Sequence, residues 1–493
     1  MQNKLYADVL VVGGGVAGVS AAIASARNGV RTLLVEKHTS LGGIATNGLV
    51  NGIAGVIEGI CREFLDRLDA QGAAVRRLRL PTFDPEKAKY VLEQWVLEEG
   101  VQILYDTYAI DAAVEENTIK HVIFHNKSGR IDVEAKVVVD ATGDADIAAY
   151  AGAPCVVGGE VFAGLNMSTT LMFKFDGVNM RRYTEAEKEY VSNMAKMGKT
   201  PKRMITALEE EAVKNGDLPY LIWPGALLYA VPGTSEENCE VTVTMAHSLY
   251  CRTLDGEDLT RQLIEQRQQI ILLEKFFRKY VPGFENCRIS GIASILGVRD
   301  SRRIVGEYVL TAEDVAAARK FEDGVAREAE GSFHHPTSKN VGVRMPAHIH
   351  VKKPVEPSTC KPAECNAEMH PIGWPGGKYE AILKPGEYWE IPYRCLVPLK
   401  VDNLLVAGRC ISTEFYAAWA VRVIAACMKT GQAAGTAAAL CVKNNVTPRK
   451  LDGKLVRKTL IEQGVQLDKD ISEVDPCWAV IKQTRSWWPP EQR

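Results

Sequence analysis

Hydrophobic positions in the first forty residues form two short runs on either side of a helical pattern. Residues 9–12 are all apolar and residues 32–35 nearly so, which is typical of strands buried on both faces of a parallel sheet. Between them, residues 16–27 place small apolar side chains at the spacing of a buried helix. The pattern predicts a strand, a helix and a second, parallel strand.

The rest of the N-terminal part carries weaker patterns of the same kinds. Residues 85–99 have apolar side chains at helical spacing, and residues 136–140 form a third buried run that ends in a glycine turn. Four segments alternate in polarity: 101–105, 110–114, 121–125 and 131–133. With a turn at 127–130, they predict small antiparallel strands.

The pattern changes at about residue 156. Residues 165–175 and 240–246 predict strands, whereas 184–215 and 258–280 predict helices. Near the C-terminus, a fourth buried run at 403–407 leads into a long helix of small residues. We expect a first domain at 1–155, an insertion at 156–394, a return to the first domain at 395–450, and a C-terminal helix and tail at 451–493.

Glycines occupy the first strand–helix turn at a spacing that dinucleotide-binding proteins use. Gly13 allows the tight turn, Gly15 lets the backbone approach a pyrophosphate, and Gly18 lets the helix pack closely on the strand. The free N–H groups at the helix N-terminus attract the phosphates. Glu36, at the end of the second strand, is placed to accept hydrogen bonds from ribose hydroxyls. These features in this order predict a dinucleotide site.

Later segments resemble the glutathione-reductase-like FAD superfamily. They contain Gly42-Gly43, Ala141-Thr142-Gly143 and Gly408-Arg409. With the stretches 291–307 and 428–439, they make the chain similar to the FAD-dependent oxidoreductase family related to fumarate reductase and succinate dehydrogenase flavoproteins, over about residues 5–445. The resemblance implies an α/β fold, in which a Rossmann-like, three-layer FAD-binding domain with a parallel sheet carries an inserted α+β substrate domain.

The fingerprint and the resemblance together predict which residues bind FAD. They are Gly13, Gly15, Val16, Ala17, Gly18, Glu36, Lys37, Gly42, Gly43, Ala45, Thr46, Ala141, Thr142, Gly143, Asp144, Arg299, Gly408, Arg409, Ala420 and Val421. In some relatives a histidine binds the flavin covalently. His38 lies too close to Gly42 to match that spacing, so we expect non-covalent FAD.

Histidines and arginines are the candidates for catalysis. The family carries an Asp-x-His element in the region where this chain has His348-Ile349-His350, so the proton-transfer role could fall to His350 or His348. The alternative for either is a loop histidine bonded to backbone. Arg302 and Arg409 match segments near the flavin, where an arginine stabilises an anionic reduced ring, binds a substrate carboxylate, or simply pairs with an acid.

The charge and the apolar content of the chain argue against nucleic acid and membrane as binding partners. The net charge is −2, and no Lys/Arg run interleaves with aromatic residues, which argues against nucleic acid. No segment reads as a membrane span, because the most apolar stretch, 417–442, contains Arg422, Lys429 and Gln432. The first strand begins by residue 8, which leaves no room for a leader, so we expect a cytoplasmic protein.

The twelve cysteines form no C-x-x-C pair. This spacing argues against a redox disulfide, an iron–sulfur cluster or an attached haem. We also predict no metal site, although Cys360 and Cys365 could form half of one, and their role stays open. The tail with Trp487-Trp488 has no assigned role either; two tryptophans there would dock on the body or on a partner.

These features predict an oxidoreductase that moves a hydride between flavin N5 and a small organic substrate, either anionic or neutral. Dehydrogenation and reduction of an activated C=C bond use the same geometry, so the direction stays open. A second dinucleotide fingerprint is missing, so the electrons would come from the substrate or from an external donor or acceptor, either transient NAD(P)H or a protein carrier. A homodimer is the default expectation. The alternatives are a flavin-dependent tRNA-modifying enzyme and a non-redox, structural flavoprotein.

Overall fold

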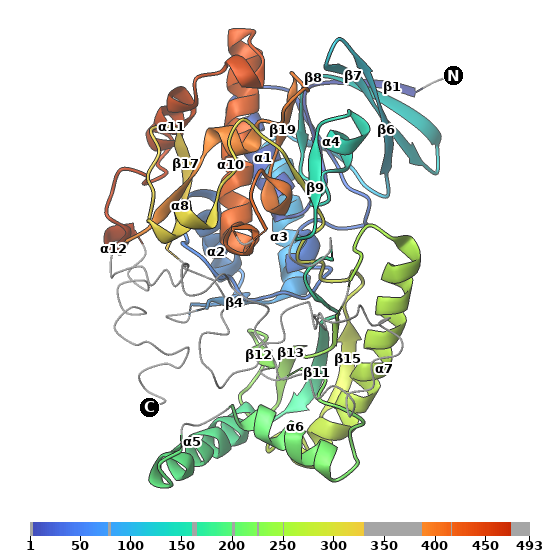
Figure 1. Ribbon diagram of the computed structural model, residues 1–493, viewed down its shortest axis with the longest axis vertical. Coiled ribbons are helices and arrows are strands. Elements are labelled where there is room, and N and C mark those ends of the chain that lie inside the picture. The colour runs from blue at the N-terminus through green and yellow to red at the C-terminus, as the bar shows by residue number, and fades with distance from the viewer. Residues whose placement is uncertain are drawn as a thin grey trace, which may run out of the picture.

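The computed structural model describes residues 3–76, 80–159, 165–199, 203–223, 226–249, 251–329, 387–415 and 417–474. These residues form an upper body around a large sheet and a lower body around a smaller one (Figure 1). Each body has its own hydrophobic core. The predicted α/β class with a parallel central sheet is confirmed.

The large sheet consists of β1 (Asn3–Val12), β2 (Thr32–Val35), β5 (Gln102–Leu104), β6 (Tyr108–Glu115), β7 (Thr118–Asn126), β8 (Gly129–Asp140) and β19 (Leu404–Val406). Five of these strands, β5, β2, β1, β8 and β19, run parallel. Val12 lies opposite both Val35 and Asp140, and Asp140 lies opposite Val406. The carboxyl ends of four parallel strands therefore meet at one edge, where ligands of open α/β sheets bind.

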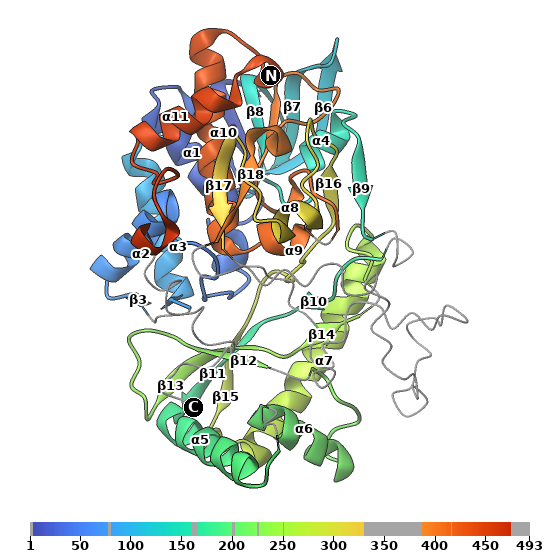
Figure 2. The same ribbon diagram turned by 60° about the vertical axis from the view of Figure 1, so that its left-hand side comes forward.

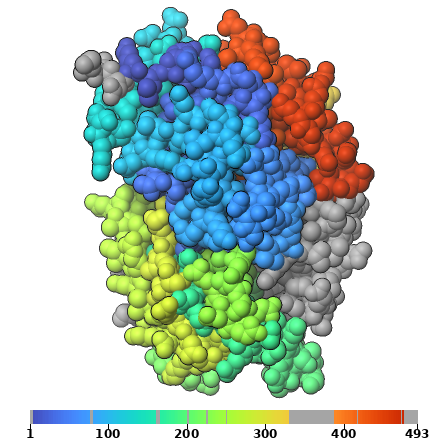
Figure 3. Space-filling view, turned by 180° about the vertical axis from the view of Figure 1, so that it is seen from behind, coloured from blue at the N-terminus to red at the C-terminus, as the bar shows by residue number. Residues whose placement is uncertain are grey.

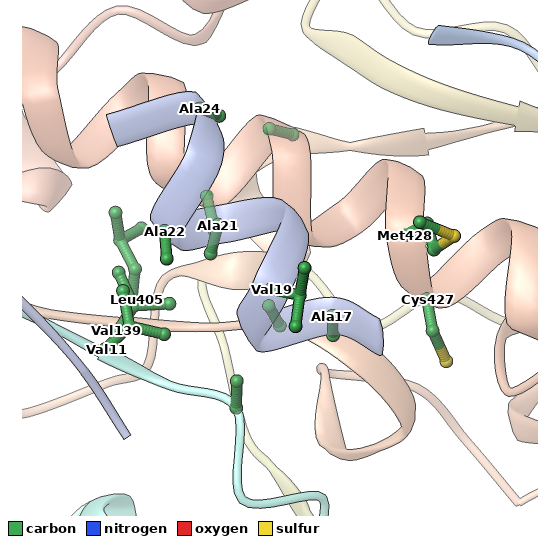
Figure 4. Close-up of a cluster of buried hydrophobic side chains, with 14 of the residues drawn as sticks. Val11, Ala17, Val19, Ala21, Ala22, Ala24, Val139, Leu405, Cys427 and Met428 are labelled. Carbon is green, nitrogen blue, oxygen red and sulfur yellow. The ribbon is translucent and has the colours of Figure 1, made fainter. Parts of the chain in front are cut away.

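Two helices of small residues cross against this sheet. α1 (Val16–Arg27) packs on α10 (Ile424–Asn444), and side chains of β1, β8 and β19 lie below α1 (Figure 4). A Cβ atom on Gly431 or Gly435 would lie 2.1 Å from a carbonyl oxygen of α1, that of Ala17 or Ala21. The glycines of α10 thus permit a backbone-to-backbone crossing, which fixes the start of α1 relative to the strands.

The remaining helices of the upper body surround this core. They are α2 (Gly59–Ala70), α3 (Pro85–Glu98), α4 (Asp146–Tyr150), α8 (Ala312–Ala316), α9 (Ala418–Val421), α11 (Gly453–Glu462) and α12 (Ile471–Val474). Two antiparallel strand pairs accompany them: β3 (Ala74–Val75) with β4 (Thr82–Phe83), and β17 (Gly324–Glu328) with β18 (Trp389–Pro392).

The lower body is an antiparallel sheet covered by helices. Its strand order is β12 (Leu227–Ala230), β13 (Cys239–Thr244), β11 (Phe173–Val178) and β15 (Arg288–Ile292). The helices are α5 (Met180–Lys196), α6 (Met204–Lys214) and α7 (Gly256–Tyr280). The short pair β10 (Thr169–Thr170) and β14 (His247–Ser248) lies between this sheet and the upper body (Figure 2).

The chain leaves and re-enters the upper body through one pair of strands. β9 (Cys155–Val157) pairs antiparallel with β16 (Arg302–Ile304). After β16, Leu310, Val325 and Trp389 belong to the core of the upper body. Seen from behind, the blue N-terminal segments lie directly against the green and yellow lower body (Figure 3).

Several local predictions differ from the structure. β5 pairs parallel with β2 rather than joining an antiparallel meander, and residues 129–140 form one strand instead of two. Residues 180–214 form two helices, α5 and α6, with a break between them. The expected long helix after Cys410 is also divided, because Val423 adopts an extended conformation and α10 begins after it.

Candidate functional site

The turn from β1 into α1 leaves an open approach to the backbone. A Cβ on Gly13, whose φ is +100°, would lie 2.5 Å from the carbonyl oxygen of Ala141, and one on Gly18 would lie 1.7 Å from that of Gly13. Gly15 differs, since a Cβ there would meet nothing within 4 Å. Side chains at 13 and 18 are thus excluded by packing, whereas the Gly15 face is free for a ligand.

Glu36 lies beside this turn with its carboxylate buried. Its Oε2 accepts from the backbone N–H of Gly14 at 2.5 Å, and its Oε1 accepts from that of His38 at 2.8 Å. The two N–H groups fix the orientation of the carboxylate. Each oxygen keeps a lone pair for a further donor, as the vicinal hydroxyls of a ribose require.

The glycine pair after β2 folds onto the first turn. The N–H of Gly42 donates to the carbonyl oxygen of Gly14 at 2.8 Å. Gly42 and Gly43 both have positive φ, +97° and +53°, and a Cβ on Gly43 would lie 3.0 Å from the Cα of Gly15. Ala45 and Thr46 follow directly and are buried, and the Thr46 hydroxyl donates to the Leu41 carbonyl oxygen at 2.5 Å.

The ends of β8 and β19 form the other side of the site. Asp140 accepts from Thr142 and from the backbone N–H of Ala148, and burial raises its pKa to about 6. Gly143 has a φ of +79°, and a Cβ there would lie 3.0 Å from Nε of Arg409. Arg409 Nη2 forms an ion pair of 2.7 Å with Asp144.

Acids hold both arginines that we predicted to be catalytic. Arg302 Nη1 lies 2.8 Å from Asp146 Oδ1 and donates to the Asp144 carbonyl oxygen. Burial works to raise the pKa of Asp144, but the charge of Arg409 and the hydrogen bond from Ser301 outweigh it and lower that pKa. Arg302 and Arg409 therefore brace the 141–146 turn.

The donors that remain fit an extended, anionic nucleotide. No side chain caps the N-terminus of α1, so its first N–H groups are available to phosphate. Arg409 Nη1 is buried and has no hydrogen-bond partner among the described residues. With the free face of Gly15 and the Glu36 carboxylate, these groups match the two ends of an adenosine diphosphate moiety.

Comparison with known proteins agrees with this geometry. The FAD dependent oxidoreductase family model matches residues 8–460. The chain belongs to this family. FAD is therefore the cofactor of this FAD-dependent oxidoreductase, in agreement with the sequence-based prediction.

Curated relatives match a smaller part of the oxidoreductase. It is 31% identical over 150 residues to a thiamine thiazole synthase of Methanococcus vannielii, a match covering 29% of this chain and 58% of that protein. It is also 31% identical over 154 residues to a tRNA uridine 5-carboxymethylaminomethyl modification enzyme of a Sulfurihydrogenibium species, covering 27% and 24%. The chain thus spans little more than half of the first relative.

Solved structures of low identity align along the whole chain. A geranylgeranyl bacteriochlorophyll reductase-like protein of Thermoplasma acidophilum is 13% identical, with a TM-score of 0.47, and the alignment covers 98% of this chain and 93% of that one.

The other predicted site residues divide into three groups. Val16, Ala17, Ala420 and Val421 are buried around the glycine turns, whereas Lys37 is exposed. Arg299 forms hydrogen bonds with Ser168 and His247 rather than with a residue of the glycine turns. His348 and His350 lie outside the described residues, as do Cys360, Cys365 and Trp487-Trp488. Within the described ranges, no cluster of His, Cys, Asp or Glu could hold a metal, and no helix is long and apolar enough to cross a membrane.

Sequence reasoning missed the residues that surround Arg299. Its Nη1 donates to the carbonyl oxygen of Ser168 at 2.5 Å, and its Nη2 lies 3.2 Å from Nε2 of His247. The His247 ring stacks on Trp223 with 3.8 Å between ring centroids and 4° between planes. Neither Ser168 nor His247 belongs to a recognisable motif, since the contacts span 131 and 52 positions of sequence.

Proposed function

We propose that this enzyme transfers a hydride between flavin N5 and a small organic substrate bound by the domain inserted between β9 and β16. FAD supplies the redox centre, so the protein has to hold it, exclude water and orient the substrate. Of the predicted segment 156–394, we assign to this domain the part before β16, because Leu310, Val325 and Trp389 belong to the core of the upper body.

One observation carries this proposal: the chain that follows Gly42-Gly43 lies against the inserted domain. The N–H of Ser294 donates to the Asn47 carbonyl oxygen at 3.0 Å, and the Thr242 hydroxyl donates to Asn51 Oδ1 at 2.5 Å. A cofactor bound at Gly15 and running along residues 42–52 would end at this domain. The flavin ring would then lie beside a substrate bound by the inserted domain.

Dehydrogenation and reduction of an activated C=C bond both remain within the proposal, because they place the substrate in the same way. The motifs resemble those of fumarate reductase and succinate dehydrogenase flavoproteins. This resemblance favours a substrate in which a carbon–carbon bond is oxidised or reduced. The cofactor residues predicted from sequence, with the exception of Arg299, form the proposed FAD site, with non-covalent binding. We propose His350 or His348 for proton transfer.

The tRNA-modifying alternative has one observation in its favour, the partial match to a tRNA uridine modification enzyme. The match covers 27% of this chain. The net charge of −2 also disfavours binding to a polyanion such as tRNA. We therefore rank it below hydride transfer to a small molecule.

The test is an anaerobic screen of the FAD-loaded protein against candidate reductants, with loss of visible flavin absorbance as the readout. Organic substrates, NADH and NADPH are added singly, and reoxidation is then tried with unsaturated acceptors. The proposal predicts saturable bleaching by at least one small organic donor, or saturable reoxidation by one acceptor. A protein whose flavin responds to none of them, yet reacts with dithionite, would favour the structural alternative.

A further inference from the structure

Arg299 is a cation whose described partners are all neutral. Its Nη1 bonds the carbonyl oxygen and hydroxyl of Ser168, and its Nη2 bonds His247. Among the described residues, Nε has no hydrogen-bond partner and no carboxylate forms an ion pair with Arg299. Arg302 and Arg409 differ, because each has an acid at 2.7–2.8 Å.

The nearest acid in sequence is directed elsewhere. Asp300 accepts from Asn166 at 3.0 Å and from the backbone N–H of Met167 at 2.5 Å, and it pairs with Arg303 at 3.7 Å. A second arginine, Arg422, adds positive charge to the region. Burial and the charge of Arg422 lower the pKa of Arg299 to about 9, the direction expected of a cation that lacks a counter-ion.

His247 cannot compensate for this charge, but it can orient the guanidinium. Its Nδ1 lies 3.1 Å from the Met245 carbonyl oxygen, so Nδ1 carries the proton and Nε2 accepts from Arg299. Burial and the charge of Arg299 hold the pKa of His247 well below its usual value, which keeps the ring neutral. The stacked Trp223 and the side chain of Gln269, which bonds the backbone of His247, hold the ring in place.

We propose that Arg299 binds a carboxylate of the substrate, which makes small organic carboxylates the substrate class of this enzyme. The assignment deepens the proposed function and rests on it. Arg299 is held by Ser168, directly before β10, and by His247 on β14, both within the inserted domain, whereas Arg302 and Arg409 bond the turn at 144–146. Since its Nε–H has no partner in the part of the chain that the structure describes, the guanidinium offers the side-on fork that carboxylates prefer.

The experiment titrates the FAD-loaded protein with benzoate and succinate, each against its amide, and with inorganic phosphate. Binding is followed by the change in the visible spectrum of the bound flavin. Arg299→Gln is compared with Arg288→Gln, which removes an exposed arginine of β15 that pairs with Asp176 on β11. A flavin-to-protein absorbance ratio equal to that of the wild type shows that each variant is folded and loaded.

We expect saturable binding of at least one carboxylate, weak binding of its amide, and a loss of at least about tenfold in Arg299→Gln only. His247→Leu should lose a similar factor, and His247→Gln should restore part of it because the amide oxygen can accept from Arg299. Equal affinity in wild type and Arg299→Gln, no spectral change with either carboxylate, or equal binding of amide or phosphate would overturn the assignment.

These titrations need bound FAD but no turnover. Carboxylate binding without any flavin reduction in the anaerobic screen would therefore keep the Arg299 site and remove the hydride-transfer proposal. Reduction by an uncharged donor, without an effect of Arg299→Gln, would do the reverse.

Discussion

Asp144 and Arg409 connect the carboxyl ends of β8 and β19 through an ion pair of 2.7 Å beside the glycine turn of Gly143. Both side chains are mostly buried, and Asp144 also accepts from Ser301. The pair therefore joins the two turns that follow these strands beside the proposed FAD site, and it leaves Nη1 of Arg409 for the cofactor.

Asp144→Asn should weaken FAD binding about tenfold, because Arg409 loses its counter-ion and the 141–146 turn loses a brace. Titration of the apoprotein with FAD measures this. The control is Asp176→Asn, which opens an exposed pair with Arg288 and should leave the affinity unchanged. If both variants bind FAD like the wild type, the pair has no role in the site.

Glu36→Ala should lower FAD affinity by at least about tenfold, since it removes the acceptor for two ribose hydroxyls and unties the N–H groups of Gly14 and His38. Glu134→Ala, on the exposed face of β8, is the matched control. The same apoprotein titration serves, and adenosine diphosphate should show a parallel loss as a competitor. Unchanged affinity would remove Glu36 from the site.

Gly431→Ala should destabilise the protein by about 1–3 kcal/mol, because the added Cβ would lie 2.1 Å from the Ala17 carbonyl oxygen and force α10 away from α1. Gly256→Ala is the control: this glycine is the first residue of α7, and a Cβ there meets nothing within 4 Å. Thermal unfolding distinguishes them, and a Gly431→Ala protein as stable as the wild type would contradict the close crossing.

Acid should destabilise the protein through His247. The folded protein holds the pKa of this histidine well below 6.5, whereas the unfolded chain titrates near 6.5. Below that pH the unfolded state binds more protons, so stability is complete above about pH 6.5 and falls as the pH drops. Thermal midpoints between about pH 5 and 8 should fall less steeply for His247→Gln than for the wild type; equal slopes would exclude this origin.

The βαβ unit was predictable because its information is local. Runs of apolar residues, a glycine spacing and one acid specify β1, α1, β2 and the position of Glu36, and the helix at 85–99 likewise matches α3.

Pairing and partners were not predictable, because they depend on contacts between distant segments. The sequence at 102–104 cannot specify that β5 joins β2 in parallel. Apolar residues also continue on both sides of Arg422, so the sequence gives no sign of the break between α9 and α10. Arg299 was placed with the cofactor by motif. Its proposed role depends on Ser168 and His247, which only the fold brings to it.

The central claim is that this chain holds FAD non-covalently in the site between Gly15 and the inserted domain. The most direct measurement is the visible absorption spectrum of the purified protein before and after acid precipitation, with Glu36→Ala alongside. We predict flavin bands in the wild type, free FAD in its supernatant, and much less in the variant. No flavin bands after addition of FAD, or colour that stays in the pellet, would contradict the claim.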